Sequence, residues 1–298
     1  MASTAVVGSQ LHRGQSPPSY DRSVNSDERQ RLSTVARRLL SGWNERFYGG
    51  AFQVMNERRY DAEKATRVLA FAHHTHRLAA AGLQVLENSD AIIAMPTIRT
   101  CFESALTAHW IAQSSDGVQA VLERETIRRR VAQDDLRKSD NPVYRTAAEN
   151  IASTEPLGLD TTSLQQAKRF EQMVKDFDGG AELYVMYRHL CGFSHASGVL
   201  SDQYLEFDAS SESVGYGLIS DPVTSDGAAE VSILACSMLW ASSAARLVQK
   251  DPAAREGELS EVAQELDTIA VLSLTEKAQA RQRTLSGRSG DAGPAEAI

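Results

Sequence analysis

A helical period of apolar residues runs through most of the chain, and it limits the folds that the chain can form. Apolar side chains recur every three or four residues, which places them on one face of a helix. The spacing is clearest in the segments 28–47, 61–86 and 90–112. An apolar stripe is stable in water only when another element covers it. We therefore expect an all-α protein, a helical bundle in a single domain.

Shorter helical segments follow, and one stretch breaks the pattern. The same period predicts further helices at 116–138, 162–177, 181–195, 225–248 and 256–281. A weak helix after the break at 139–142 is expected to end at residue 150. After residue 195 the period changes to alternation at 204–207 and 214–219, around a turn-rich stretch. This alternation predicts a minor β-hairpin directly after the helix 181–195.

The two ends of the chain lack any apolar period. Residues 1–26 and 286–298 are rich in small and polar side chains. Such segments bury too little apolar surface to offset the entropy lost on folding. We expect both ends to be disordered and the helical domain to occupy residues 27–285.

Charge and hydropathy disfavour two classes of protein. A formal net charge of −8 argues against a protein that coats nucleic acid, because neutralising many phosphates takes a broad basic surface. A small, shielded phosphate site is still compatible with this charge. No apolar run reaches the roughly 18 residues of a membrane span, and the N-terminus lacks the apolar segment of a signal peptide. We expect a cytoplasmic protein without a membrane partner.

Neither the cysteines nor the main histidine cluster predicts a cofactor. The three cysteines are widely separated in helical patterns, so we expect buried thiols and no disulfide framework: Cys101, Cys191 and Cys236. The run His73-His74-x-His76 invites a metal interpretation. Adjacent histidines on a helix point about 100° apart, however, and no third ligand is evident nearby. We expect no metal and no cofactor.

Arg188 and His195 form the pattern that most strongly suggests chemistry. Seven residues of helix are close to two turns, so the two side chains share a face about 10 Å apart along the axis. A phosphodiester can bridge such a pair. The predicted core stripe of this helix is Leu183, Met186, Tyr187, Leu190 and Ser194. A second stripe, at the edge of the first, is Tyr184, Arg188, Cys191 and His195.

These two residue types suit RNA cleavage by attack of a 2′-hydroxyl on its own phosphate. Histidine transfers protons near neutral pH, and the planar arginine fork meets two phosphate oxygens at once. Stabilising the charge that develops at the phosphorus is usually the largest catalytic contribution. One chain offers only one suitable histidine, so a two-fold homodimer is needed to supply the second Arg188 and His195.

The same residues carry a family resemblance. Arg188, the polar His189 after it and His195 resemble the Arg/His motif of the HEPN superfamily (higher eukaryotes and prokaryotes nucleotide-binding), over residues from about 60 to 250. With Arg99-x3-Glu103, the chain also looks like an uncharacterised bacterial branch of all-helical proteins, a domain of unknown function. The resemblance implies a dimeric, metal-independent endoribonuclease of toxin or defence type. Arg188 and His195 would be catalytic, with four residues in support: His189, Tyr184, Arg99 and Glu103.

Two other interpretations of the chain stay open. Arg188 can be a structural arginine and His195 a helix-terminal histidine that satisfies terminal carbonyls. The chain is then a non-enzymatic helical interaction or regulatory protein with a protein partner. It can also be a module that binds a nucleotide without hydrolysing it. The i, i+4 pair of Arg99 and Glu103 contributes only a few tenths of a kcal/mol if exposed, whereas a buried pair can orient the motif helix.

Overall fold

The computed structural model describes most of the 298-residue chain: residues 22–50, 52–55, 61–151, 155–159, 161–208, 215–220, 222, 226–251 and 255–289. These residues form 12 α-helices and one two-stranded antiparallel sheet. The expected all-α bundle with a minor hairpin is therefore confirmed.

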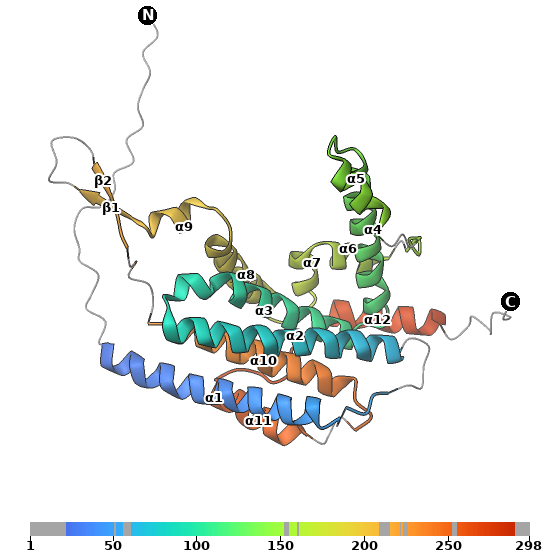
Figure 1. The fold of residues 1–298 in the computed structure, drawn as a ribbon. Helices are drawn as coiled ribbons and strands as arrows, with labels where there is room; N and C mark the ends of the chain where they lie inside the picture. The colour runs from blue at the N-terminus through green and yellow to red at the C-terminus, as the bar shows by residue number, and fades with distance from the viewer. Residues whose placement is uncertain are drawn as a thin grey trace, which may run out of the picture.

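Four long helices make the centre of the bundle. They run beside one another in Figure 1 and are α1 (Arg22–Tyr48), α2 (Asp61–Asn88), α3 (Ala91–Gln113) and α10 (Ala228–Leu247). The largest fully buried side chains include Trp110, Phe102 and Ile98 of α3. Because α3 is packed against both α2 and α10, few of its positions face solvent. Cys101 of this helix is buried, as expected, while Cys191 and Cys236 are only partly covered.

Helix α10 is buried to an unusual degree. It meets the length and mean hydropathy of a membrane span, and 72% of its most apolar window is covered by the rest of the protein. A helix that is apolar all round and enclosed by other helices is typical of the core of a soluble protein. The cytoplasmic location stays a prediction.

The remaining helices pack around this centre. Figure 1 shows one group standing out from the bundle, with α4 (Gly117–Arg137), α5 (Pro142–Glu149), α6 (Thr162–Lys168) and α7 (Phe170–Val174). A second group leads to the hairpin through α8 (Gly180–Ser194), α9 (Gly198–Asp202), β1 (Leu205–Asp208) and β2 (Gly215–Leu218). In the hairpin, Leu205 pairs with Leu218. The chain closes with α11 (Glu256–Glu265) and α12 (Glu276–Ser289).

Two predicted helices are each divided in two. The segment 162–177 is broken at Arg169, which has extended dihedrals (φ −129°, ψ 114°). The segment 256–281 is broken between α11 and α12, because residues 266–275 are held by distant partners. The N–H of Leu272 donates to Nε2 of His109 (3.1 Å), and Leu274 forms an isolated β-bridge with Phe177. Tertiary contacts override the local helical period at both places.

The helical part extends beyond the expected boundaries. Helix α1 begins at Arg22, before the expected start at residue 27, and α12 runs to Ser289, past residue 285. The predictions of disorder for residues 1–21 and 290–298 lie outside the described residues.

Candidate functional site

Helix α8, which carries the predicted site, is an unbroken helix from Gly180 to Ser194. It begins where the backbone packs closely against the end of α7. Gly179 adopts a left-handed conformation (φ 72°), and a Cβ on Gly180 would lie 2.2 Å from the carbonyl oxygen of Val174. Gly192 does not interrupt the helix. The spacing between Arg188 and the end of the helix is therefore helical.

Helix α8 rests on α3 with one side only. Leu190 is buried and Leu183 is partly buried, in agreement with the predicted core stripe. Met186 belonged to that stripe, but it is 38% exposed, and its neighbour Val185 is 67% exposed. The prediction of a buried Met186 is wrong, because no described helix covers this flank of α8. An apolar strip is left on the solvent side of the helix.

Arg99 fastens α8 to α3. Its Nη2 donates to the Tyr187 hydroxyl (2.7 Å), its Nε donates to Sγ of Cys191 (3.2 Å), and Nη2 lies 3.5 Å from Oε2 of Glu103. Burial opposes the charge on Arg99, but the hydrogen bond and charge interaction with Tyr187 help to raise the pKa of Arg99 above its ordinary value. The guanidinium also lies 5.2 Å from the centre of the Tyr187 ring. The structure thus brings Arg99 and Glu103 together with α8.

Tyr184 and Arg188 lie on the side of α8 that faces α7. The carboxylate of Glu171 on α7 receives a hydrogen bond from Lys175 (2.6 Å). Chiefly through that bond, with contributions from Tyr184 and the charge of Arg188, the pKa of Glu171 lies below its ordinary value. Arg188 itself is exposed. Its guanidinium is therefore close enough to feel the charge of Glu171 but remains open to solvent.

His195 lies one residue beyond the end of α8. Its dihedrals are extended (φ −123°, ψ 158°), so it caps the helix instead of continuing it. Two serines hold this turn: Ser194 Oγ donates to the Leu190 carbonyl (2.6 Å), and Ser197 Oγ accepts from the Leu200 N–H (3.1 Å). His195 is exposed and makes no hydrogen bond or ion pair within the described part of the chain. The turn presents the imidazole to solvent.

His189, predicted to support the site, points to another side of α8. It is one residue from Arg188 and so is rotated by about 100° around the helix axis. Its ring meets Phe193 edge to face at 5.1 Å. It is exposed, beside the uncovered Val185 and Met186. Within one chain, His189 and Arg188 lie on different sides of the helix.

Two residues around the site were not predicted. Glu171 lies near Arg188, and Ser197 closes the turn at His195 by donating from Oγ to the Gly192 carbonyl. Each has a weak sequence signal: Glu171 and Lys175 have the i, i+4 spacing of a helical ion pair, and Ser197 is a favoured residue at a helix N-cap. Neither signal indicates that the residue lies beside α8.

Two of the three clustered histidines of α2, His73 and His76, are already engaged, while His74 is exposed. Both ring nitrogens of His76 are in hydrogen bonds, to the Ala72 carbonyl (2.7 Å) and with Ser242 Oγ (3.1 Å). His73 accepts a hydrogen bond from Trp43 Nε1 (3.2 Å). No group of three or more metal-ligating side chains occurs among the residues that the structure describes.

Comparison with known proteins gives one match. Residues 66–213 match a family of unknown function (DUF5677), and this range contains Arg99, Glu103 and all of α8. No curated protein and no solved structure matches the chain. The match fits the expected likeness to an uncharacterised domain, while membership of the HEPN superfamily stays a prediction.

Proposed function

We propose that the chain is a metal-independent endoribonuclease that acts as a homodimer through α8. The observation that carries this proposal is that Arg188 and His195 are both exposed, one at each end of the last two turns of the helix. Neither side chain makes a hydrogen bond or ion pair within the described part of the chain, so both are free to meet a phosphate group.

The uncovered strip of α8 supports self-association. Val185 and Met186 are exposed on the same helix as Arg188, beside the exposed His189. Exposed apolar side chains gathered on one face are typical of contact surfaces. Two copies that pack through this strip, related by a two-fold axis beside α8, would cover it and supply two arginines and two histidines.

The proposed reaction is a transesterification. The 2′-oxygen bonds to the phosphorus as its proton passes to the neutral imidazole of His195. The bond from phosphorus to the 5′-oxygen breaks, and this oxygen takes a proton from the protonated His195 of the partner subunit. Arg188 binds the non-bridging oxygens, whose negative charge grows at the phosphorus. The products are a 2′,3′-cyclic phosphate and a 5′-hydroxyl.

Other residues serve as positioning residues. Arg99 and Glu103, through Tyr187 and Cys191, hold α8 on α3. Tyr184 and Glu171 orient Arg188 from the side of α7. We expect their replacement to lower the rate by shifting α8 or Arg188, without removing a reacting group.

Incubation of the full-length protein with end-labelled RNA in EDTA tests the proposal. We expect fragments that end in 2′,3′-cyclic phosphate, and a loss of about 100-fold or more in rate for His195→Ala, as is usual for a general acid or base. His74→Ala is the matched control, because His74 is exposed on α2 outside the site. Absence of cleavage, or equal rates for wild type and His195→Ala, would contradict the proposed catalytic role of His195.

A non-enzymatic interaction protein is the second candidate, and further exposed apolar side chains favour it. Beyond α8, Val199 of α9 is 51% exposed and Leu218 of β2 is 84% exposed. If this surface serves only to bind a protein partner, Val185→Asp abolishes partner binding while His195→Ala leaves it unchanged. RNA then stays intact under all conditions.

A further inference from the structure

A polar cavity of about 570 Å³ lies where α6, α7 and α12 meet. Its volume is in the range of sites for small organic ligands. Its wall is unusual, because polar and charged side chains make up the whole lining: Thr162, Gln165, Gln166, Arg169, Gln172, Lys175, Asp176, Thr275, Lys277 and Arg281. None of these residues belongs to α8, so the cavity is distinct from the site proposed above.

The lining is strongly basic in an otherwise acidic chain. Four cationic side chains face a single carboxylate, that of Asp176, whereas the whole chain has a net charge of −8. Asp176 is paired with Arg281 (2.6 Å), and Lys175 is paired with Glu171 (2.6 Å). Arg169 and Lys277 have no ion pair within the described part of the chain and are exposed at the rim. The cavity therefore has uncompensated positive charge.

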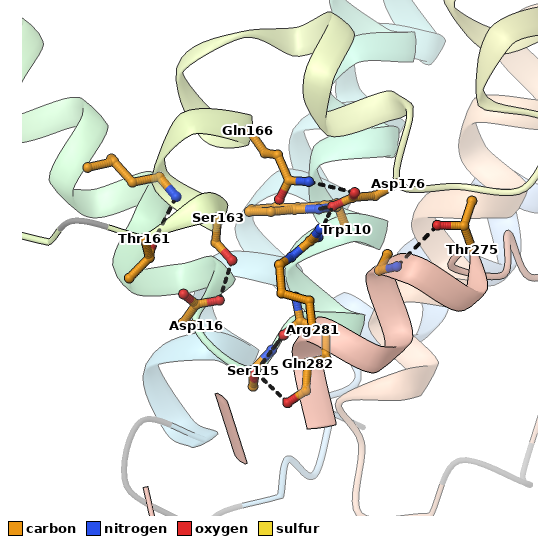
Figure 2. Close-up of polar contacts among 12 residues, drawn as sticks. Trp110, Ser115, Asp116, Thr161, Ser163, Gln166, Asp176, Thr275, Arg281 and Gln282 are labelled. Carbon is orange, nitrogen blue, oxygen red and sulfur yellow. Dashed lines mark hydrogen bonds and ion pairs between the residues drawn. The ribbon is translucent and has the colours of Figure 1, made fainter. Parts of the chain in front are cut away.

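The inner wall is rigidly built around Asp176, which is only 5% exposed. Figure 2 shows Arg281 reaching from α12 to this carboxylate, beside Gln166 of α6 and Trp110 of α3. Asp176 accepts hydrogen bonds from Trp110 Nε1 (2.9 Å), Gln166 Nε2 (2.6 Å) and Arg281 Nη2 (2.6 Å). Since the carboxylate fixes their positions, Gln166 and Arg281 are pre-organised to meet a ligand.

Each of these two side chains also has a buried polar atom without a partner. Gln166 is 8% exposed, and its Oε1 accepts no hydrogen bond from the described residues. Nε of Arg281 likewise donates none. Both atoms are enclosed behind the surface of the cavity. A ligand therefore meets the exposed cations of the lining, Arg169 and Lys277, first.

We propose that this cavity binds a small phosphorylated ligand. Arg281, Lys277 and Arg169 hold the phosphate, whose oxygens accept from the guanidinium and ammonium groups. Inorganic phosphate, pyrophosphate and nucleotides share this chemistry, and the choice of probes separates them.

Titration calorimetry of the full-length protein at low ionic strength tests the proposal, with phosphate, pyrophosphate, ATP and adenosine as probes. We expect at least one phosphorylated probe to bind and adenosine not to bind. Binding of ATP alone assigns a nucleotide, whereas equal affinity for pyrophosphate assigns the phosphate groups as the whole determinant. Lys277→Gln and Arg169→Gln should each weaken binding about tenfold, the usual effect of losing one charge-assisted hydrogen bond.

Lys168→Gln is the matched control, because Lys168 is exposed at the end of α6 and outside the lining. It should leave the affinity unchanged. The proposal is overturned if no phosphorylated probe binds to the folded protein, or if Lys277→Gln and Arg169→Gln bind as tightly as wild type. The same titration with His195→Ala separates this result from the nuclease assay, since that variant should bind the ligand normally.

Discussion

Two histidines in the core, His76 and His109, tie the stability of the protein to pH. The backbone N–H of Leu272 can only donate, so Nε2 of His109 is its acceptor (3.1 Å), and Nδ1–H donates to the Trp240 carbonyl (3.0 Å). His76 has the same arrangement, with Nδ1–H bonded to a carbonyl. Burial is the main cause that lowers the pKa of His76 to about 3 and that of His109 to about 4. Both rings are neutral in the folded protein.

The folded protein should therefore lose stability in mild acid. In the unfolded chain, His76 and His109 bind protons below the ordinary pKa of about 6.5, while the folded state does not, so stability rises with pH across this window. At pH 5.5 the free energy of unfolding should be about 3 kcal/mol lower than at pH 7.5, roughly 1.4 kcal/mol for each ring. Urea unfolding at a series of pH values measures this loss.

A histidine variant and a control separate this effect from other titrations. His109→Gln should remove about half of the pH dependence, whatever its effect on stability at pH 7.5. His74→Gln should leave the pH dependence unchanged, because His74 is exposed. A free energy of unfolding that is flat between pH 7.5 and 5.5 would contradict the assignment of buried neutral rings.

At the scale of the element, the two glycines of α8 have opposite roles. A Cβ on Gly180 would meet the backbone of Val174 at 2.2 Å, and the backbone cannot yield without moving α8. A Cβ on Gly192 would lie 3.9 Å from Val199, which is ordinary contact. We expect Gly180→Ala to destabilise the protein by about 3 kcal/mol, the upper part of the usual overpacking range. Gly192→Ala should stabilise it by up to about 1 kcal/mol, because alanine favours the helix.

Chemical denaturation of the two variants measures whether Gly180→Ala lowers and Gly192→Ala raises the free energy of unfolding. Each variant is the control for the other, since both add one methyl group to the same helix. Stabilisation by Gly180→Ala, or a clear loss in Gly192→Ala, would show that the ends of α8 are packed differently.

Most helix boundaries could be predicted from the sequence, whereas the break between α11 and α12 could not. The long helices were predicted to within a few residues at most ends, because an amphipathic stripe specifies its own helix; α2 was expected at 61–86 and is Asp61–Asn88. The division between α11 and α12 was missed, because His109 and Phe177, far away in sequence, hold the intervening segment.

The candidate site was predicted in the same uneven way. Spacing predicted an accessible edge for Arg188 and His195, and both are exposed. The period identified the apolar side of α8, but it could not indicate that a neighbour covers Leu190 and leaves Met186 open. The placement of Glu171 near Arg188 depends on how the chain turns between α7 and α8, which no local pattern specifies.

At the scale of the whole molecule, Asp176 joins four parts of the chain, and its partners Trp110 and Arg281 are distant from it in sequence. Through Trp110, Gln166 and Arg281 it links α3, α6 and α12 to the segment that precedes α8. Asp176→Asn leaves the partly buried Arg281 without its counter-charge. We expect a loss of about 3 kcal/mol in the free energy of unfolding, because removing one partner of a buried pair leaves the other charge uncompensated.

A double-variant cycle tests the coupling. Asp176→Asn combined with Arg281→Gln should be less destabilised than the sum of the two single variants, since the isolated charge is gone. Urea unfolding supplies all three values. Strictly additive losses would mean that Asp176 and Arg281 stabilise the fold independently.

Two cysteines in different surroundings, Cys101 and Cys191, can report separately on the bundle and on the contact between α3 and α8. Cys101 is enclosed in the bundle, and burial raises the pKa of its thiol to about 12, so it reacts with an alkylating reagent only when the bundle itself opens. Cys191 lies at the seam between α3 and α8, under Arg99. Because Cys191 is only partly covered in the folded protein, it should be alkylated before Cys101, and both reactions can be timed in one sample.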